Sequence, residues 1–154
     1  MFRPSPLLAV ALSTLILTAM AHADAPDPKA AIVARQQGFK TMGAAMKAMK
    51  AQLASDVPDK AAMATAATTI RDTAPLQGAL FPSGSGAEAG LKTDALPAIW
   101  TDKAKFDGDM AALVTEAGKL VVTVQGGDKD AIAAQVKAVG GTCAACHHQF
   151  RQDT

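Results

Sequence analysis

The sequence predicts an all-α protein, an antiparallel four-helix bundle with a long crossover between its second and third helices. Four segments carry apolar residues at helical spacing, and the β-branched residues form no alternating runs that would indicate strands. The chain contains 7 methionines and no tyrosine, and its many alanines favour helix over strand. A segment rich in glycine, serine and proline, residues 75–100, divides the four segments into two pairs.

The first predicted helix runs from about Pro28 to Ala54. Asp27 precedes it, and the proline in its first turn has no N–H that would need a partner there. Apolar residues recur along this segment at helical steps and define the face that we expect to be buried: Ile32, Phe39, Met46 and Leu53, with Met42 and Met49 between them.

The second predicted helix runs from about Pro58 to Ala74. Asp56 or Val57 precedes it, and Pro75 ends it because proline cannot donate a backbone hydrogen bond. The crossover that follows contains "FPSGSGAEAG" and "LPAIW" and is long for a compact domain, so we expect it to cross the fold or cover a site.

The third predicted helix begins near Thr101 or Asp102, runs to Val124 and ends before the pair Gly126-Gly127. Asp128 is the expected cap of the fourth helix, which reaches the end of the chain. The inward rows of these two helices are Phe106, Met110, Leu113, Ala117, Leu120 and Val124 in the third, and Ile132, Val136 and Val139 in the fourth.

The first residues have the pattern of a secretory signal peptide, residues 1–23, ahead of a single domain, residues 24–154. Arg3 supplies the positive charge, an apolar run from Leu7 to Met20 follows, and Ala21-His22-Ala23 fits the cleavage pattern. We therefore expect a cut after Ala23 and a periplasmic protein without a membrane segment, the alternative being an uncleaved anchor.

Charge argues against nucleic acid as a partner. Without Arg3 the chain keeps 14 Lys and Arg side chains against 14 Asp and Glu, so it lacks the basic excess of a nucleic-acid-binding protein. An exported chain meets an oxidising compartment, in which two cysteines normally form a disulfide unless something else holds them.

The C-terminal stretch "TCAACHHQFR" holds both cysteines and two of the three histidines. On the fourth helix, at about 100° per residue, Cys143 and Cys146 continue the inward row and Phe150 follows them. His147 lies at the edge of that face, and His148 is rotated outward.

Three chemistries compete for this spacing. A redox pair or disulfide needs only Cys-x-x-Cys, but redox pairs usually open a helix after a strand. Zinc needs four ligands in a tetrahedron, and four donors within six residues of one helix surround an ion poorly. Cys-x-x-Cys-His is the signature of covalent haem attachment, in which each thiol forms a thioether and the histidine ligates iron, and we predict one haem c per chain.

Several side chains keep two interpretations each. His148 is a surface residue or, if the helix were rotated, an alternative iron ligand. Arg151 is a helix-end charge or a neighbour of the proximal pocket. The methionines of the first helix, Met42, Met46 and Met49, are core packing or supply a sixth iron ligand. Trp100 and Phe106 flank the haem or pack the core.

Arg35 lies on the apolar face of the first helix, on the row that continues into Met42 and Met49. A buried guanidinium is costly unless paired, and a haem propionate would supply a carboxylate that arginine can bind with two hydrogen bonds. The alternative is that Arg35 extends along the surface to solvent.

Three stretches resemble the cytochromes c prime, the class II c-type cytochromes: "VGGTCAACHHQFR" is similar to their C-terminal haem motif, "RQQGFKTMGAAMK" to their first helix, and "PAIW" with "AKF" to the entry into their third. The resemblance covers essentially the whole chain after the signal peptide, and it implies an antiparallel four-helix bundle with haem inside one end.

In that family the residue four positions after the first-helix arginine covers the haem face opposite the histidine. The resemblance therefore assigns this place to Phe39, which cannot ligate iron, and implies a five-coordinate, high-spin haem. A distal pocket without hydrogen-bond donors would hold O₂ poorly and would still admit nitric oxide or carbon monoxide. The resemblance also implies possible electron transfer with a redox partner protein and a homodimer formed by the first two helices. Gly43, Ala44, Ala45 and Ala48 would allow close packing in such a dimer and would equally suit a contact within the chain. The sequence indicates no general acid–base pair and no distal histidine for turnover, so we do not expect an enzyme.

Two alternatives remain at this point. The first is a low-spin electron carrier with Met42 or a neighbour as sixth ligand. The second is a structural bundle without haem, which leaves the Cys-x-x-Cys-His row unexplained.

Overall fold

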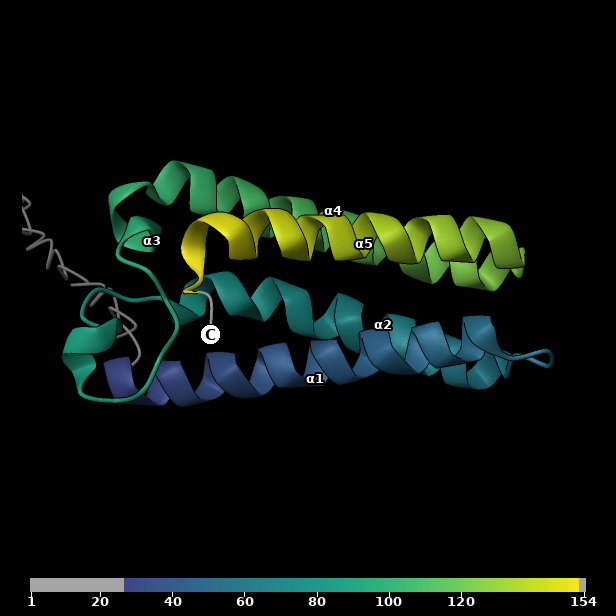
Figure 1. Ribbon diagram of the computed structural model, residues 1–154, viewed down its shortest axis with the longest axis horizontal. Helices are drawn as coiled ribbons and strands as arrows, with labels where there is room; N and C mark the ends of the chain where they lie inside the picture. The colour runs from purple at the N-terminus through teal and green to yellow at the C-terminus, as the bar shows by residue number, and fades with distance from the viewer. Residues whose placement is uncertain (1–26, 153–154) are drawn as a thin grey trace, which may run out of the picture.

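Four long helices form the molecule in the computed structural model, which describes residues 27–152. Helices α1 (Pro28–Ala54) and α2 (Lys60–Gln77) make one antiparallel pair, and α4 (Lys103–Gly126) and α5 (Lys129–Phe150) make the other (Figure 1). The predicted fold class is confirmed. The predicted signal peptide, residues 1–23, lies outside the described residues, and no helix among residues 27–152 is long and apolar enough to span a bilayer.

Two aspartates begin helices as the sequence predicts. The side chain of Asp27 accepts a hydrogen bond from the backbone N–H of Ala30 at 2.8 Å, with Pro28 in the first turn of α1. The side chain of Asp128 accepts one from Ala131 at 2.7 Å at the start of α5. Each satisfies an N–H group that a helix start leaves without a partner.

Both predicted boundaries of the second helix were wrong. Asp59 is the N-cap, because its carboxylate accepts hydrogen bonds from Ala61 and Ala62, so α2 begins at Lys60 rather than near Pro58. At the other end the helix continues through Pro75 to Gln77. Proline removes one backbone hydrogen bond, and in the last turn, with an exposed ring, that loss does not stop two further helical residues.

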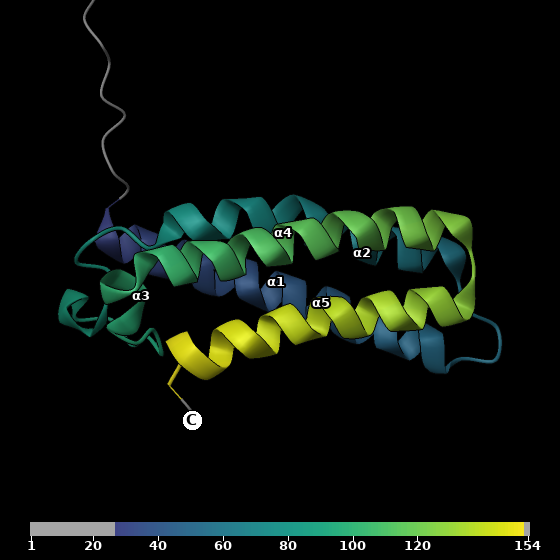
Figure 2. The same ribbon diagram turned by 90° about the horizontal axis from the view of Figure 1, so that it is seen from above.

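The crossover contains three short helical pieces: η1 (Gly78–Leu80), η2 (Ala87–Ala89) and α3 (Ala98–Thr101). Because α3 intervenes, the third long helix begins at Lys103, slightly later than predicted. The crossover gathers at one end of the bundle, where α1 begins and α5 ends (Figures 1 and 2). The indole N–H of Trp100 donates to the carbonyls of Phe81 and Pro82, at 3.1 Å each, and holds the loop folded there.

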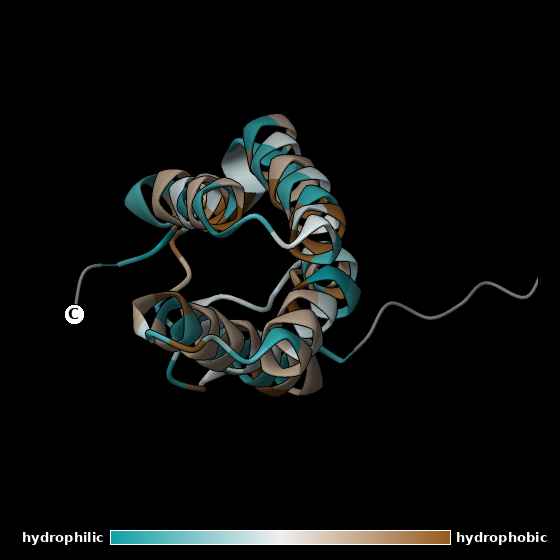
Figure 3. Cartoon of the chain, turned by 90° about the vertical axis from the view of Figure 1, so that its right-hand side faces the viewer, coloured by the Kyte–Doolittle hydropathy of each residue, from teal (hydrophilic) through white to brown (hydrophobic). Residues whose placement is uncertain are grey.

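The core lies along the axis of the bundle, and its inward rows are largely those that the spacing predicts. An end-on view shows the helices arranged around the bundle axis (Figure 3). α1 and α5 make fewer contacts with each other than the other neighbouring pairs do. Phe39, Met46 and Leu53, which we expected to be buried, are half-buried. Phe39 and Met46 face α5 across this sparse contact, which we call the α1–α5 seam.

Candidate haem site

The two thiols lie on the inward side of α5. Cys143 and Cys146 are half-buried and pack against the core, in line with the buried side chains of Ile132, Val136, Val139 and Phe150. Both are free thiols in the structure. Within residues 27–152 no three side chains of His, Cys, Asp or Glu are grouped closely enough to hold a metal ion between them.

The surroundings of the thiols keep them protonated. Burial raises the pKa of the Cys146 thiol to about 11, and the negative charge of Asp109 acts in the same direction. Burial also raises the pKa of the Cys143 thiol. Since the thiolate is the reactive form, both cysteines are poor nucleophiles near neutral pH, unlike the low-pKa thiols of redox enzymes.

The next residue, His147, lies at the rim of the seam. Its ring meets the ring of Phe39 edge-on, with 6.5 Å between centroids and 74° between planes. Burial lowers the pKa of His147, and the positive charge of Arg151 lowers it further. The lowered pKa favours the neutral imidazole, which is the form that binds metals. His147 and His148 are both exposed, and of the two only His147 lies against Phe39; the outward place of His148 agrees with its position on the helix.

An aromatic row leads inward from the seam. The ring of Phe39 lies 6.4 Å from that of Phe81, and Phe81 contacts Phe106 at 4.8 Å, edge to face. Phe106 meets Phe150, three residues beyond His147, at 5.4 Å. Phe106 is therefore a core residue at 1% exposure, whereas half-buried Trp100 packs beside Phe81 and ties down the loop.

Arg35 is buried at 2% exposure, so it does not extend to solvent. Its Nη1 donates to the carbonyl of Leu80 and the hydroxyl of Ser85, and its Nη2 to the carbonyl of Ser85 and the hydroxyl of Thr93, at 2.7–3.2 Å. The guanidinium also lies 4.5 Å above the Phe81 ring. Among the described residues these acceptors use all four N–H groups of Nη1 and Nη2 and leave only that of Nε.

The crossover ties the two sides of the seam together. Gln36 on α1 donates to the carbonyl of Lys92 at 2.8 Å, and the N–H of Leu96 donates to the carbonyl of Phe150 at 3.0 Å. Arg151 lies beside Asp94, with 3.4 Å between Nη2 and Oδ2. Residues 92–96 therefore connect the beginning of α1 with the end of α5.

The methionines of α1 differ in their surroundings. Met42 and Met49 are buried in the core, at 6% and 0% exposure. Met46 is half-buried and its methyl group approaches Gly140 of α5. All three have packing roles, and Met46 is the one that lies in the seam.

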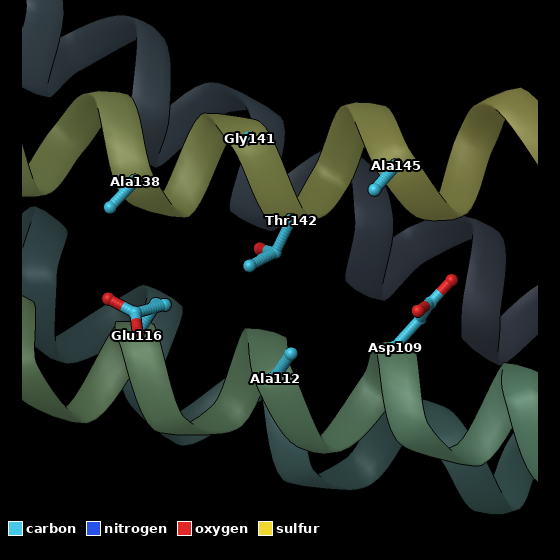
Figure 4. A pocket seen from close by; sticks show the side chains of 7 residues that line it. All are labelled: Asp109, Ala112, Glu116, Ala138, Gly141, Thr142 and Ala145. Atoms are coloured by element: carbon cyan, nitrogen blue, oxygen red, sulfur yellow. The ribbon is translucent and has the colours of Figure 1, made fainter.

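A groove between α4 and α5 lies on the side of α5 that faces away from Phe39 (Figure 4). It is on the α4 side of α5, whereas His147 points to the α1 side, so it does not join His147 to Phe39. Its lining consists of small and acidic residues: Asp109, Ala112, Glu116, Ala138, Gly141, Thr142 and Ala145.

Within the described part of the chain, Gln77 is one of two buried polar residues that the sequence did not predict, the other being Ser85 in the crossover. Gln77 was assigned to the crossover because Pro75 was expected to end α2. In the structure it continues the inward row of α2 and is 2% exposed. The spacing signal was present, since Gln77 follows Ala74 by three and Ile70 by seven.

The residues at the seam fit a covalently bound haem. Two thiols lie one helical turn apart on α5 and are followed directly by an imidazole, and an aromatic ring without a ligating atom faces that imidazole from α1. Fold and site together define the class: a four-helix bundle built to carry a c-type haem near one end.

Known proteins agree with this class. Residues 30–151 match the family described as Cytochrome C'. The cytochrome c' of Rhodospirillum rubrum is 36% identical over 150 residues, which span 96% of this chain and 97% of that protein. The crystal structure of cytochrome c' from Thermochromatium tepidum superposes with a TM-score of 0.79 at 27% identity and covers 84% of this chain and 99% of that one. The chain belongs to the cytochrome c prime family, whose members carry covalently attached haem c.

Two further similar structures bear on ligands. One is a nitric oxide complex of a variant of cytochrome c prime from Alcaligenes xylosoxidans, with a TM-score of 0.74 at 27% identity, covering 83% of this chain and 98% of that one. The other is a cytochrome c' with a ligand-controlled dimer dissociation. It superposes with a TM-score of 0.77 at 26% identity and covers 83% of this chain and 98% of that one.

Proposed function

We propose that this chain is a periplasmic cytochrome c prime with one five-coordinate haem that binds nitric oxide and carbon monoxide on its Phe39 side. The observation that carries the proposal is the edge-on approach of Phe39 to His147 across the α1–α5 seam, at 6.5 Å. A residue that can ligate iron and one that cannot lie on opposite sides of the seam.

Four residues would have separate roles in binding the haem and its ligands. Cys143 and Cys146 would hold the haem through thioethers, and His147 would ligate its iron as a neutral imidazole. Phe39 would exclude water and larger molecules from the other face. A bound haem supplies an iron that takes diatomic ligands and exchanges single electrons, and the site offers no acid–base pair for turnover, so we propose a ligand binder rather than an enzyme.

Arg35 would contribute differently from the two-bond contact that its residue type suggests. Its Nη1 and Nη2 atoms hold the loop acceptors Leu80, Ser85 and Thr93. A propionate would therefore meet its Nε–H, or would replace one of these acceptors, while the charge balances the carboxylate.

The ligand assignment draws support from the nitric oxide complex of the Alcaligenes xylosoxidans relative, and the proposed homodimer from the relative with ligand-controlled dimer dissociation. Export rests on the signal pattern of residues 1–23. The mass of the secreted chain should correspond to a first residue of Asp24 plus one haem.

Absorption spectra test the proposal against the electron carrier with a methionine ligand. Protein matured with haem should give five-coordinate, high-spin spectra in both oxidation states, and carbon monoxide should change the ferrous spectrum. Six-coordinate, low-spin bands that carbon monoxide leaves unchanged would instead indicate a sixth protein ligand. Met42→Leu and Met46→Leu would then show which methionine supplies it.

A structural bundle without haem predicts a third result. Intact-mass measurement after co-expression with cytochrome c maturation proteins should show one haem per chain. Cys143→Ser with Cys146→Ser should abolish the added mass, and Cys143→Ala alone should leave at most one thioether. A natural chain without any added mass would reject the haem site.

A further inference from the structure

Gln77 has a buried side-chain amide with an unused hydrogen-bonding capacity. Its side chain is 2% exposed, and its Oε1 has no partner among the described residues. Its Nε2 makes one long contact, 3.3 Å, to the carbonyl of Thr73, which leaves its second N–H free. The other buried polar side chains, Arg35 and Ser85, bond to each other at 2.9 Å. A buried amide without hydrogen-bond partners costs free energy, so we expect a further polar partner for it.

The amide lies against the helix that carries Phe39. Gln77 extends the inward row of α2 toward α1, where its amide meets the backbone at Gly38. A Cβ atom on Gly38 would stand 2.2 Å from Nε2 and 2.6 Å from Oε1. Glycine at this position therefore leaves room for the amide beside the residue that directly precedes Phe39 in α1.

We propose that Gln77 is a ligand-binding residue that hydrogen-bonds the small molecule on the Phe39 side of the haem. The inference rests on the function proposed above and differs from the sequence-based expectation that this side has no hydrogen-bond donor. The amide presents a donor and an acceptor on one planar group, and rotation about its last bond exchanges them. The N–H suits a diatomic gas, which accepts, and the carbonyl suits water, which donates.

The test compares Gln77→Leu with the natural protein, both loaded with haem. Leucine keeps much of the volume and removes both polar atoms. In the carbon monoxide complex, the C–O stretching band should move to higher wavenumber, because loss of a donor weakens electron transfer from iron into the C–O bond. Nitric oxide should dissociate about two- to tenfold faster, the factor that one net hydrogen bond represents. Gln37→Leu, on the exposed side of α1, is the matched control and should change neither reading.

Gly38→Ala gives a second test that leaves Gln77 in the chain. The added Cβ would displace the amide, a cheap shift because the amide is the far end of a flexible side chain. Alanine also favours helix, so this variant should fold even if Gln77→Leu does not. Its C–O band should move in the same direction.

The outcomes separate this proposal from the one on which it rests. A carbon monoxide complex whose band and nitric oxide dissociation rate are unchanged in both variants would overturn the role of Gln77 and leave the open haem site standing. A natural protein that forms no carbon monoxide complex would overturn both.

Discussion

At the scale of single residues, the site depends on how a few polar groups are held inside an apolar bundle. Arg35 illustrates this, because it lies in the core and is paired with neutral oxygens rather than with a carboxylate. Its residue type suggested an ion pair, yet the crossover brings Ser85 and Thr93 to it from 50 and 58 residues away. No local pattern encodes such a contact.

Replacing Arg35 should therefore destabilise the fold. Arg35→Met leaves buried acceptors on the crossover without donors, and we expect the free energy of unfolding to fall by about 2–4 kcal/mol. Arg35→Lys keeps a charged group that can donate hydrogen bonds, so its free energy of unfolding should fall less than that of Arg35→Met. Urea unfolding followed by circular dichroism measures both. Arg71→Met, in an exposed pair with Asp72, should leave the unfolding midpoint nearly unchanged; a similar loss there would mean that burial is not the cause.

Phe39 should act as a gate for small ligands. Phe39→Ala opens the α1 side of the seam, and we expect carbon monoxide to bind about tenfold faster, the effect of lowering a barrier by about 1.4 kcal/mol. Flash photolysis of the carbon monoxide complex gives the rate. Val33→Ala, on the exposed side of the same helix at 60% exposure, is the control. Equal rates for Phe39→Ala and the natural protein would remove Phe39 from this role.

At the scale of elements, each helix end depends on one or two local groups. Asp27 and Asp128 cap helices as predicted, because a cap needs only a side chain within three residues of the N–H groups that it accepts from. The prediction that Pro75 ends α2 was wrong, because a proline in the last turn removes only one backbone hydrogen bond and two further helical residues follow it. That error also hid Gln77, since a residue in a loop has no predicted face.

Contacts between helices should also give the bundle a pH dependence. Glu116 of α4 accepts hydrogen bonds from Lys119 at 2.6 Å and from Gln135 of α5 at 2.7 Å, and these lower the pKa of its carboxyl group. A carboxyl whose pKa is lower in the folded state stabilises the fold above its unfolded pKa, near 4.5. This contribution is lost as the pH falls from there through the folded pKa.

Gln135→Leu should reduce this acid sensitivity. The variant removes one of the two donors, so the thermal midpoint should fall less between pH 5 and about pH 3 than in the natural protein. Scanning calorimetry across that range measures the difference. Gln125→Leu, at an exposed position near the end of α4, should keep the natural pH profile. Parallel pH curves for Gln135→Leu and the natural protein would contradict the coupling of α4 and α5 through Glu116.

At the scale of the whole molecule, the α1–α2 pair offers a surface for the proposed homodimer. Gly43, Ala44 and Ala48 are exposed and leave room for a second chain, whereas Ala45 is buried within the bundle itself. Ala44→Arg should therefore convert a dimer to a monomer in sedimentation velocity. Ala111→Arg, exposed on α4, should remain dimeric; dissociation of both or of neither would place the interface elsewhere.

By itself the sequence determined the helices, their inward rows and the haem signature of Cys143, Cys146 and His147. These depend on spacing along one helix, which a 3.6-residue period translates directly into direction. Only the tertiary structure decided what faces them, because contacts between α1, α2, α5 and the crossover depend on how separate segments pack. It turned Phe39 to His147, enclosed Arg35 with the crossover, and set the amide of Gln77 beside Gly38.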